Sequence, residues 1–365
     1  MRSERRASGF TLDWTRGVEE SPPEAMRAVW ITRHGGPETL QVRETDDPIP
    51  RTGEMRIRVQ ACGLSFSDVL ARQGQNPAAP PPPCVLGMEG AGIVDWVGEG
   101  VADHHVGRRV AYFCRFGGQA SAVCVPSAQV AELPDTIDSE AAAALPVDYL
   151  TAHHMLFEVG HLRPGSSVLV HLAASSVGIA LLQLCRTVPD VTVYATAPGR
   201  QHALLGEHGC HHPIDYTAVD YADEIQRLTR GDGVDLILDP LGGKDWKLGY
   251  SLLRSAGLLI AYGMANANRG GKRSWRSTLG QILRMPRYSP LRLMSDNRAI
   301  AGVNLGQLFE RGALLHRQFH ALTRLVETEA LLPRVTGSYP FSRADAGHRQ
   351  VELATDPGKV VLRPE

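Results

Sequence analysis

The alternation of apolar and polar residues divides the chain into two parts of different character. From residue 26 to about residue 144, short runs alternate the two kinds of side chain, as residues 56–60 do, which is typical of half-buried β-strands. Turns rich in glycine follow one another between Gly87 and Gly107. This pattern predicts a barrel-like β domain at the start of the chain.

Near residue 140 the period changes, and apolar runs begin to alternate with helical segments. Buried strands are predicted at residues 167–172, 191–196, 234–239 and 258–262. Helices are predicted at residues 149–159, 178–185, 201–208 and 246–253. The alternation predicts an α/β Rossmann domain with a doubly wound parallel sheet, which residues 299–305 would close as a last strand. Residues 341–362 look β-like again, so we expect the C-terminus to return to the first domain.

These patterns give a provisional division of the chain. Residues 1–25 show no periodicity and are expected to form a disordered tail. A β-rich domain is predicted at 26–146, and the proline tract at 77–83 within it is expected to be an extended loop. An α/β domain follows at 147–308, with a basic segment at 267–298, and residues 309–365 complete the first domain.

Composition excludes several classes of protein. With 365 residues, a formal net charge of -1 and 43% apolar residues, the chain is typical of a soluble globular protein, and nothing in its overall charge favours nucleic acid as a partner. The six cysteines form no CxxC pair, which favours reduced, buried thiols in a cytoplasmic protein. No apolar run approaches the roughly 20 residues that a membrane-spanning helix needs.

A turn of small residues follows the first predicted strand of the Rossmann domain. A dinucleotide site needs small residues for the turn, for the approach of backbone to the pyrophosphate and for helix packing. Ala173, Ser175 and Gly178 occupy these places, with Ser176 and Val177 between the last two. The turn therefore predicts a nicotinamide-dinucleotide site, in which Ser175 weakens or shifts cofactor binding if its side chain obstructs the pyrophosphate.

The end of the second Rossmann strand favours NADPH over NAD. An NAD site places an acidic side chain there to accept hydrogen bonds from the ribose, whereas this chain has Thr196 followed by Arg200. Arg200 is either a ligand of the 2′-phosphate or a solvated residue at the start of a helix. Tyr216 is expected to cover the same phosphate.

The motifs of the chain resemble those of the medium-chain dehydrogenase/reductase superfamily, and within it the zinc-free quinone oxidoreductase branch. The resemblance extends from residue 26 to residue 362 and is closest to the synaptic vesicle amine transport protein homologues of that branch. The segments that carry it include residues 61–68, 71–74, 87–92, 97–98, 107–110, 140–143, 183–188, 213–216, 239–243, 262–266 and 297–299.

This resemblance implies a fold and several binding residues. The first domain would be GroES-like and β-rich, and a homodimer would form through the edge strand near residues 299–305. The nicotinamide would be bordered by Thr151, Gly263, Asn266 and Val303, and Lys359 would lie near the adenosine part of the cofactor.

Zinc ligands are missing from the positions where related alcohol dehydrogenases carry them. Ser65 and Met88 occupy those positions, and a hydroxyl and a thioether cannot replace thiolate and imidazole as ligands of Zn²⁺. We therefore expect no bound metal. Hydride addition to an electron-poor C=C bond or to a quinone needs chiefly positioning and a hydrogen bond to the carbonyl, so the chain is predicted to be an NADPH-dependent enone or quinone reductase.

Three residues near the expected cleft are candidates for substrate contact or proton transfer. Ser65 either donates a hydrogen bond to a carbonyl or closes a turn. Asp148 and Tyr149 are either proton donors or substrate contacts, and the alternative role of Asp148 is to cap the helix that follows. Two other functions stay open: a cofactor-binding, membrane-associated or lipid-associated protein with little turnover, and a reductase fold recruited to non-redox biosynthetic chemistry.

One segment is strongly biased in charge. Residues 269–298 contain eight Arg or Lys residues and one acidic residue, Asp296, interleaved with apolar side chains. Such a composition fits a surface segment whose apolar residues pack on its own domain, a lid over the active site or a peripheral contact with an anionic membrane. Pro286 and Pro290 are expected to divide it into short helices.

Overall fold

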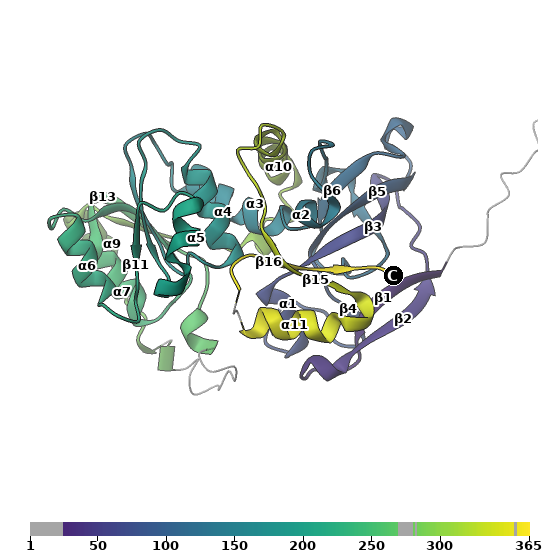
Figure 1. Ribbon diagram of the computed structural model, residues 1–365, viewed down its shortest axis with the longest axis horizontal. Coiled ribbons are helices and arrows are strands. Elements are labelled where there is room, and N and C mark those ends of the chain that lie inside the picture. The colour runs from purple at the N-terminus through teal and green to yellow at the C-terminus, as the bar shows by residue number, and fades with distance from the viewer. Residues whose placement is uncertain (1–24, 269–279, 282, 354–355) are drawn as a thin grey trace, which may run out of the picture.

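The computed structural model describes residues 25–268, 280–281, 283–353 and 356–365. The tail expected at residues 1–25 therefore lies outside the described residues, apart from Ala25 at the start of the first strand. Most of the first half of the basic segment also lies outside them. Figure 1 shows two lobes joined by α2 and α3, with α10 and the C-terminal strands between them.

The first lobe contains two sheets of mainly antiparallel strands. In the smaller sheet, β1 (Ala25–Ile31) pairs with β2 (Leu40–Asp46) and β4 (Cys84–Val85). The larger sheet has the order β15-β16-β3-β5-β6-β8, with β7 also paired to β3. Its strands are β3 (Glu54–Leu64), β5 (Glu89–Val97), β6 (Arg109–Phe113), β7 (Ala122–Pro126), β8 (Val130–Glu132), β15 (Val335–Pro340) and β16 (Lys359–Arg363).

The C-terminal segment returns to this lobe, but part of its predicted structure is wrong. Between β15 and β16 lie η8 (Phe341–Arg343) and the helix α11 (Ala344–Leu353), where the sequence pattern was interpreted as β-like. Ala344, Gly347 and His348 are buried at helical spacing, and Leu353 is exposed, so the segment buries one face of a helix against the sheet. Val360–Leu362 then pair with Leu64–Cys62 of β3.

Helical segments complete the first lobe. They are α1 (Phe66–Arg72), α2 (Ser139–Ala143), α10 (Gly312–Glu327), η1 (Pro37–Thr39), η2 (Asp103–His105), η3 (Ser127–Gln129) and η7 (Leu305–Gln307). The tract at residues 77–83 contains no helix or strand, as its prolines predict. It precedes β4 in the chain.

The second lobe is a parallel sheet with the order β11-β10-β9-β12-β13-β14. Its strands are β9 (Ser167–Val170), β10 (Thr192–Thr196), β11 (His212–Ile214), β12 (Val234–Asp239), β13 (Leu253–Ala261) and β14 (Ala299–Gly302). Its helical segments are α3 (Pro146–His153), the π-helical η4 (His154–Val159), α4 (Ser176–Cys185), η5 (Gly199–Gln201), α5 (His202–Glu207), α6 (Tyr221–Leu228), α7 (Lys244–Leu252), η6 (Ala265–Asn268) and α9 (Pro290–Asp296). The doubly wound α/β prediction is confirmed, and α9 begins at Pro290 as predicted.

Alternate residues of each strand face opposite sides of this sheet. Val168 and Val170 of β9 pack in the apolar cluster that contains α3 and α4, whereas Leu169 packs in the cluster that contains α6 and α7. Both faces are therefore covered by helices, as Figure 1 shows. This explains why the strand segments are continuously apolar in sequence.

The strand order fixes where a ligand can bind. The sheet runs from β9 outward through β10 and β11 on one side and through β12, β13 and β14 on the other. In open parallel sheets, the crevice lies at the carboxyl ends of the two strands where this direction reverses. Here those strands are β9 and β12, and the turn of small residues follows β9.

Candidate cofactor and active site

The turn after β9 brings α4 unusually close to the strand. A Cβ atom on Gly178 would lie within 2.5 to 2.6 Å of three backbone atoms of Ala173. Ala173 is fully buried, and its N–H donates a 3.2 Å hydrogen bond to the carbonyl of Thr196 on β10. Glycine at 178 is therefore required for the helix to start here, which fits the third small position of a dinucleotide turn.

Ser175 caps the helix that starts at Ser176. Its hydroxyl accepts a 3.1 Å hydrogen bond from the N–H of Gly178, so one of the N–H groups at the helix start already has a partner. Ser175 is exposed, and Ser176 and Val177 are half-buried. The backbone of Ser175 also forms a parallel bridge to Gly358, which ties the turn to the start of β16.

The predicted cofactor contacts at and after the end of β10 differ in exposure. Thr196 is buried, and its hydroxyl lies 3.1 Å from Nδ1 of His171. Arg200, four residues on, is exposed and has no hydrogen bond or ion pair to any described residue. Tyr216 is 41% exposed. Arg200 and Tyr216 thus keep their side chains available, whereas Thr196 is engaged inside the lobe.

Buried polar atoms without partners gather at the carboxyl edge of the parallel sheet. Within the described part of the chain, four such atoms are Nε2 of His171, Oδ2 of Asp239, the hydroxyl of Tyr262 and Oδ1 of Asn266. These residues follow β9, end β12 and follow β13. Because a buried polar atom without a partner costs roughly 1–3 kcal/mol, a polar ligand that hydrogen-bonds to these four atoms would stabilise the fold.

Burial also changes the acid-base properties of two of these groups. The pKa of His171 is lowered to about 4 because its ring is buried, so the ring is neutral. Burial raises the pKa of Asp239 to about 7, although its carboxylate accepts backbone hydrogen bonds from Leu241 and Gly242. Neither group therefore brings a firmly held charge to this edge at neutral pH.

The residues expected around the nicotinamide lie on the β12, β13 and β14 side of this edge. Gly263 follows β13, and the N–H of Val303 donates to the carbonyl of Ala261 at 2.9 Å. The side-chain amide of Asn266 donates to the carbonyl of Gly242 at 3.2 Å. Thr151 lies apart from these three on α3, where its hydroxyl donates to the carbonyl of Val147 at 2.7 Å.

Lys359 lies in a buried ion cluster between the two lobes. Its ammonium group is 2.9 Å from Oδ2 of Asp148 and also contacts Glu89, and the side chains of all three residues are at most 5% exposed. Glu89 accepts a further 2.7 Å hydrogen bond from the N–H of Val147. The cluster joins β16, α3 and β5, and Lys359, Asp148, Tyr149 and Ser176 line one small cavity.

The charges of this cluster depend on one another. Burial raises the pKa of Glu89 to about 7, Lys359 opposes the shift and Asp148 adds to it. Burial alone would lower the pKa of Lys359, but the two carboxylates raise it above its ordinary value. The ammonium group is therefore charged at all ordinary pH values, and it pairs with both Asp148 and Glu89.

The other two residues expected to take part in chemistry are also engaged. Tyr149 is buried, and its hydroxyl donates a 2.9 Å hydrogen bond to Gln183 of α4. Ser65 is half-buried, and its hydroxyl donates to Asp68 at 3.1 Å while its N–H donates to the same carboxylate oxygen at 2.9 Å. Tyr149 thus links two helices, and Ser65 keeps only its lone pairs for a substrate.

The donor set at the position of the catalytic zinc does not fit zinc. Ser65 and Met88 occupy that position, and the Ser65 hydroxyl is bonded to Asp68, which itself accepts a 3.0 Å hydrogen bond from the N–H of Gly87. Among the described residues no group of three or more His, Cys, Asp and Glu side chains has the arrangement to hold a metal ion.

Several residues of this region were not predicted from the sequence. Four buried polar residues of the site were missed. Two of them, Glu89 and Gln183, contact Lys359 and Tyr149, and the other two, His171 and Asp239, each have one polar atom without a partner. A signal existed for Asp239 and His171, because a polar residue directly after an apolar strand marks the carboxyl edge of a sheet. No signal of this kind identifies Glu89, whose partner is 270 positions away in the sequence.

Replacement of Lys359 by Met should destabilise the protein by about 3–5 kcal/mol at neutral pH, because it leaves Glu89 and Asp148 buried without a counter-charge. The native pKa of Glu89 lies above its ordinary 4.5, so the folded chain binds that proton more tightly than the unfolded chain does. Without the ammonium group this pKa rises further. The deficit of Lys359→Met is therefore expected to be largest above about pH 7 and to shrink as the pH falls toward about 5.

Urea unfolding at several pH values measures this deficit. Lys244→Met is the matched control, since Lys244 is exposed and pairs with no described residue, and it should change the free energy of unfolding by less than about 0.5 kcal/mol. Equal effects of the two substitutions, or a deficit of Lys359→Met that grows at low pH, would contradict the proposed charge balance.

Matching families and similar solved structures both support the fold. The family described as alcohol dehydrogenase GroES-like domain matches residues 51–135, and the family described as zinc-binding dehydrogenase matches residues 208–362. Human synaptic vesicle membrane protein VAT-1 homolog-like protein has a solved structure with a TM-score of 0.80 and 34% identity, covering 93% of this chain and 98% of that one. A mycobacterial protein solved in complex with NADPH has a TM-score of 0.79 and 29% identity, covering 93% and 100%.

Sequence relatives agree with this picture. The synaptic vesicle membrane protein VAT-1 homolog of Rattus norvegicus is 43% identical over 346 residues, which is 94% of this chain and 85% of the relative. A quinone oxidoreductase of Pseudomonas aeruginosa is 30% identical over 328 residues, which is 86% and 98% of the two chains. The GroES-like and Rossmann fold and the resemblance stated from sequence motifs are confirmed: the chain belongs to the medium-chain dehydrogenase/reductase superfamily, as a VAT-1 homologue related to the quinone oxidoreductases.

Proposed function

We propose that this protein is a zinc-independent, NADPH-dependent reductase that transfers hydride to the C=C bond of an α,β-unsaturated carbonyl or to a quinone. The proposal rests chiefly on the group of four buried polar atoms without partners. They lie beside the turn in which Gly178 packs against Ala173, at the edge of the sheet where the strand order reverses. A ligand with many polar groups satisfies such a site. The likeness to a mycobacterial protein solved with NADPH and to quinone oxidoreductases supports the same reading.

Their exposure and position make several residues available to bind the cofactor. The turn from Ala173 to Gly178, with α4 starting behind it, suits the pyrophosphate, and Arg200 with Tyr216 suits the 2′-phosphate. Gly263, Asn266 and Val303 would border the nicotinamide. When bound, NADPH supplies the hydride.

The chain's own residues supply positioning. Ser65 is the candidate for contact with the substrate, because it is partly exposed and its oxygen still has lone pairs, whereas Asp148 and Tyr149 hold Lys359 and Gln183 in place. Conjugate reduction ends in an enolate, which water can protonate. The reaction therefore needs orientation of the two reactants and no dedicated acid from the protein.

A panel of enones and quinones tests the proposed reaction directly. Mixing each compound with the full-length protein and NADPH should give a loss of NADPH absorbance that depends on both substrate and protein, after fluorescence titration has established that NADPH binds. Failure to bind NADPH at millimolar concentration would refute the proposal. Binding without turnover on any member of the panel would instead favour a cofactor-binding protein of another function.

Arg200→Ala should weaken NADPH binding about tenfold, because it removes a charge-assisted contact with the 2′-phosphate at an exposed position. NADH lacks that phosphate and is the internal control, so its affinity should stay within about twofold. Fluorescence titration of both cofactors against both proteins measures the ratio. An equal loss for the two cofactors would remove Arg200 from the phosphate site.

A second candidate role is peripheral contact with an anionic membrane. Leu283, Leu291 and Met294 of the basic segment are 77%, 77% and 75% exposed, and Arg284, Arg287 and Arg292 lie between them in sequence. Relatives named as synaptic vesicle membrane proteins support such a contact. Among the described residues no helix is long and apolar enough to cross a membrane.

Flotation with vesicles that contain phosphatidylserine tests this contact. Leu291→Ser together with Met294→Ser should reduce the floated fraction severalfold, because the two side chains would no longer enter the interface. Leu353→Ser is the matched control, since Leu353 is 71% exposed on α11 in the other lobe. Flotation that is unchanged in the double variant would remove α9 from the contact.

We also infer a cytoplasmic homodimer. Within the described residues β14 ends the parallel sheet, and its outer edge has no strand partner, so a second copy of the chain can pair there.

A further inference from the structure

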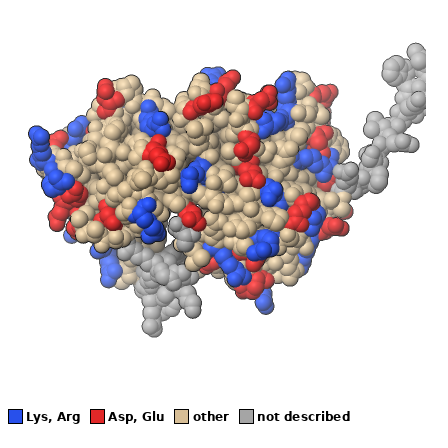
Figure 2. All heavy atoms as spheres, in the orientation of Figure 1, with Lys and Arg blue, Asp and Glu red and all other residues tan. Residues whose placement is uncertain are grey.

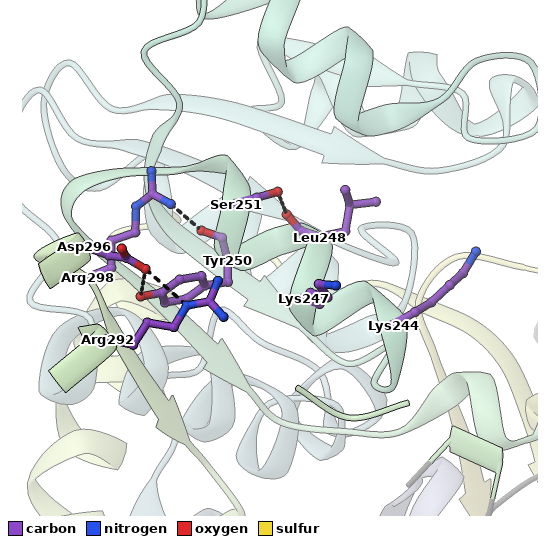
Figure 3. Close-up of a pocket in the computed structure, with 8 residues that line it drawn as sticks. All are labelled: Lys244, Lys247, Leu248, Tyr250, Ser251, Arg292, Asp296 and Arg298. Carbon is purple, nitrogen blue, oxygen red and sulfur yellow. Dashed lines mark hydrogen bonds and ion pairs between the residues drawn. The ribbon is translucent and has the colours of Figure 1, made fainter. Parts of the chain in front are cut away.

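A basic pocket lies between α7 and α9, on the side of the Rossmann lobe where these two helices pack. Its volume is about 620 Å³, within the range of small-molecule sites. Both walls are described parts of the chain, and Figure 3 shows the residues that line them. The residues that line it are Lys244, Lys247, Leu248, Tyr250, Ser251, Arg292, Asp296 and Arg298.

Cationic side chains dominate this lining. Lys244, Lys247, Arg292 and Arg298 are among the lining residues, and Asp296 is the single carboxylate among them. Lys244 and Lys247 are exposed and pair with no described residue. In Figure 3 the guanidinium group of Arg292 reaches from α9 toward Lys247 on α7, whereas Lys244 extends away along the other end of the pocket.

The carboxylate of Asp296 is already engaged by the walls. It accepts a 3.0 Å hydrogen bond from the hydroxyl of Tyr250 and lies 3.5 Å from Nε of Arg292. Arg298 donates to the carbonyl of Tyr250 at 3.1 Å, which holds α7 against the segment after α9. Asp296 therefore offsets Arg292 in part, and the two lysines are left without a counter-charge.

Aromatic rings fix the position of Arg292. Its guanidinium group lies 5.8 Å from the ring centre of Tyr250 and 5.6 Å from that of Tyr288, and the two rings are 4.5 Å apart. A cation held over aromatic faces loses little freedom when it binds an anion. The wall that contains Arg292 is therefore ordered before a ligand binds.

We propose that this pocket binds a phosphate-bearing anion, with Lys244 and Lys247 on one wall and Arg292 on the other as its ligands. A phosphate group carries more than one negative charge and accepts hydrogen bonds in several directions, which matches cations that approach from two helices. The pocket shares no lining residue with the turn at 173–178 or with the buried ion cluster. It is therefore a site separate from that of the proposed cofactor.

Inorganic tripolyphosphate is the probe, titrated calorimetrically into the full-length protein with and without NADPH. We expect binding that weakens as NaCl rises from low to physiological concentration, since the contacts are ionic. Lys244→Glu combined with Lys247→Glu should weaken it by at least about tenfold. Arg163→Glu is the matched control, because Arg163 is exposed and its side chain pairs with no described residue, and it should leave the affinity unchanged.

Titration with NADPH separates this proposal from the proposed function. The double variant should bind NADPH as the natural chain does, whether or not that chain reduces any compound in the panel. If the double variant binds tripolyphosphate with native affinity, or if NADPH displaces all the bound tripolyphosphate, the pocket is not the site and the proposal is overturned.

Vesicles identify the source of the phosphate. Phosphatidylcholine vesicles carrying phosphatidylinositol monophosphate are floated with the natural chain and the double variant. Flotation that the double variant loses and tripolyphosphate abolishes assigns the pocket to a lipid headgroup. Flotation that is absent or equal in both proteins, together with the loss of tripolyphosphate binding, assigns it to a soluble phosphate compound. Absence of both kinds of binding in the natural chain overturns the proposal.

Discussion

The buried ammonium group of Lys359 is the contact on which the arrangement of the two lobes depends. It lies between Glu89 of the larger sheet and Asp148 of α3, so one charge joins three segments that are distant in the sequence. Such a cluster tolerates little displacement, because either carboxylate would be left buried and unpaired. The backbone bridge between Ser175 and Gly358, the residue before Lys359, also ties the turn at the start of α4 to the first lobe.

Polar groups near the cleft are largely used to hold one another. Asp148 pairs with Lys359, Tyr149 donates to Gln183, and Ser65 donates to Asp68. Some of the buried polar atoms without a described partner lie at the carboxyl edge of the parallel sheet, on His171, Asp239 and Tyr262. This division suits chemistry that a bound dinucleotide carries out while the protein supplies shape and orientation.

The charge of the molecule is balanced overall but not locally. Figure 2 shows cationic and anionic side chains interspersed over one face, in keeping with the net charge of -1. The pocket between α7 and α9 departs from this balance, and the apolar side chains of α9 are exposed beside it. Lys244 and Lys247 pair with no described residue there, and this charge arrangement is the basis of the proposed phosphate site.

The sequence by itself determined the fold and the place of the cofactor turn, because apolar periodicity and the small residues at 173–178 are local properties. It also identified Ser65 and Met88 as poor zinc ligands, which depends on side-chain chemistry alone. It failed at 344–353, where a helix was taken for β structure, and it did not identify the buried pairing of Lys359 with Asp148 or of Tyr149 with Gln183. Only the tertiary structure decided those pairings, because the fold brings each buried polar group to a partner that is distant in the sequence.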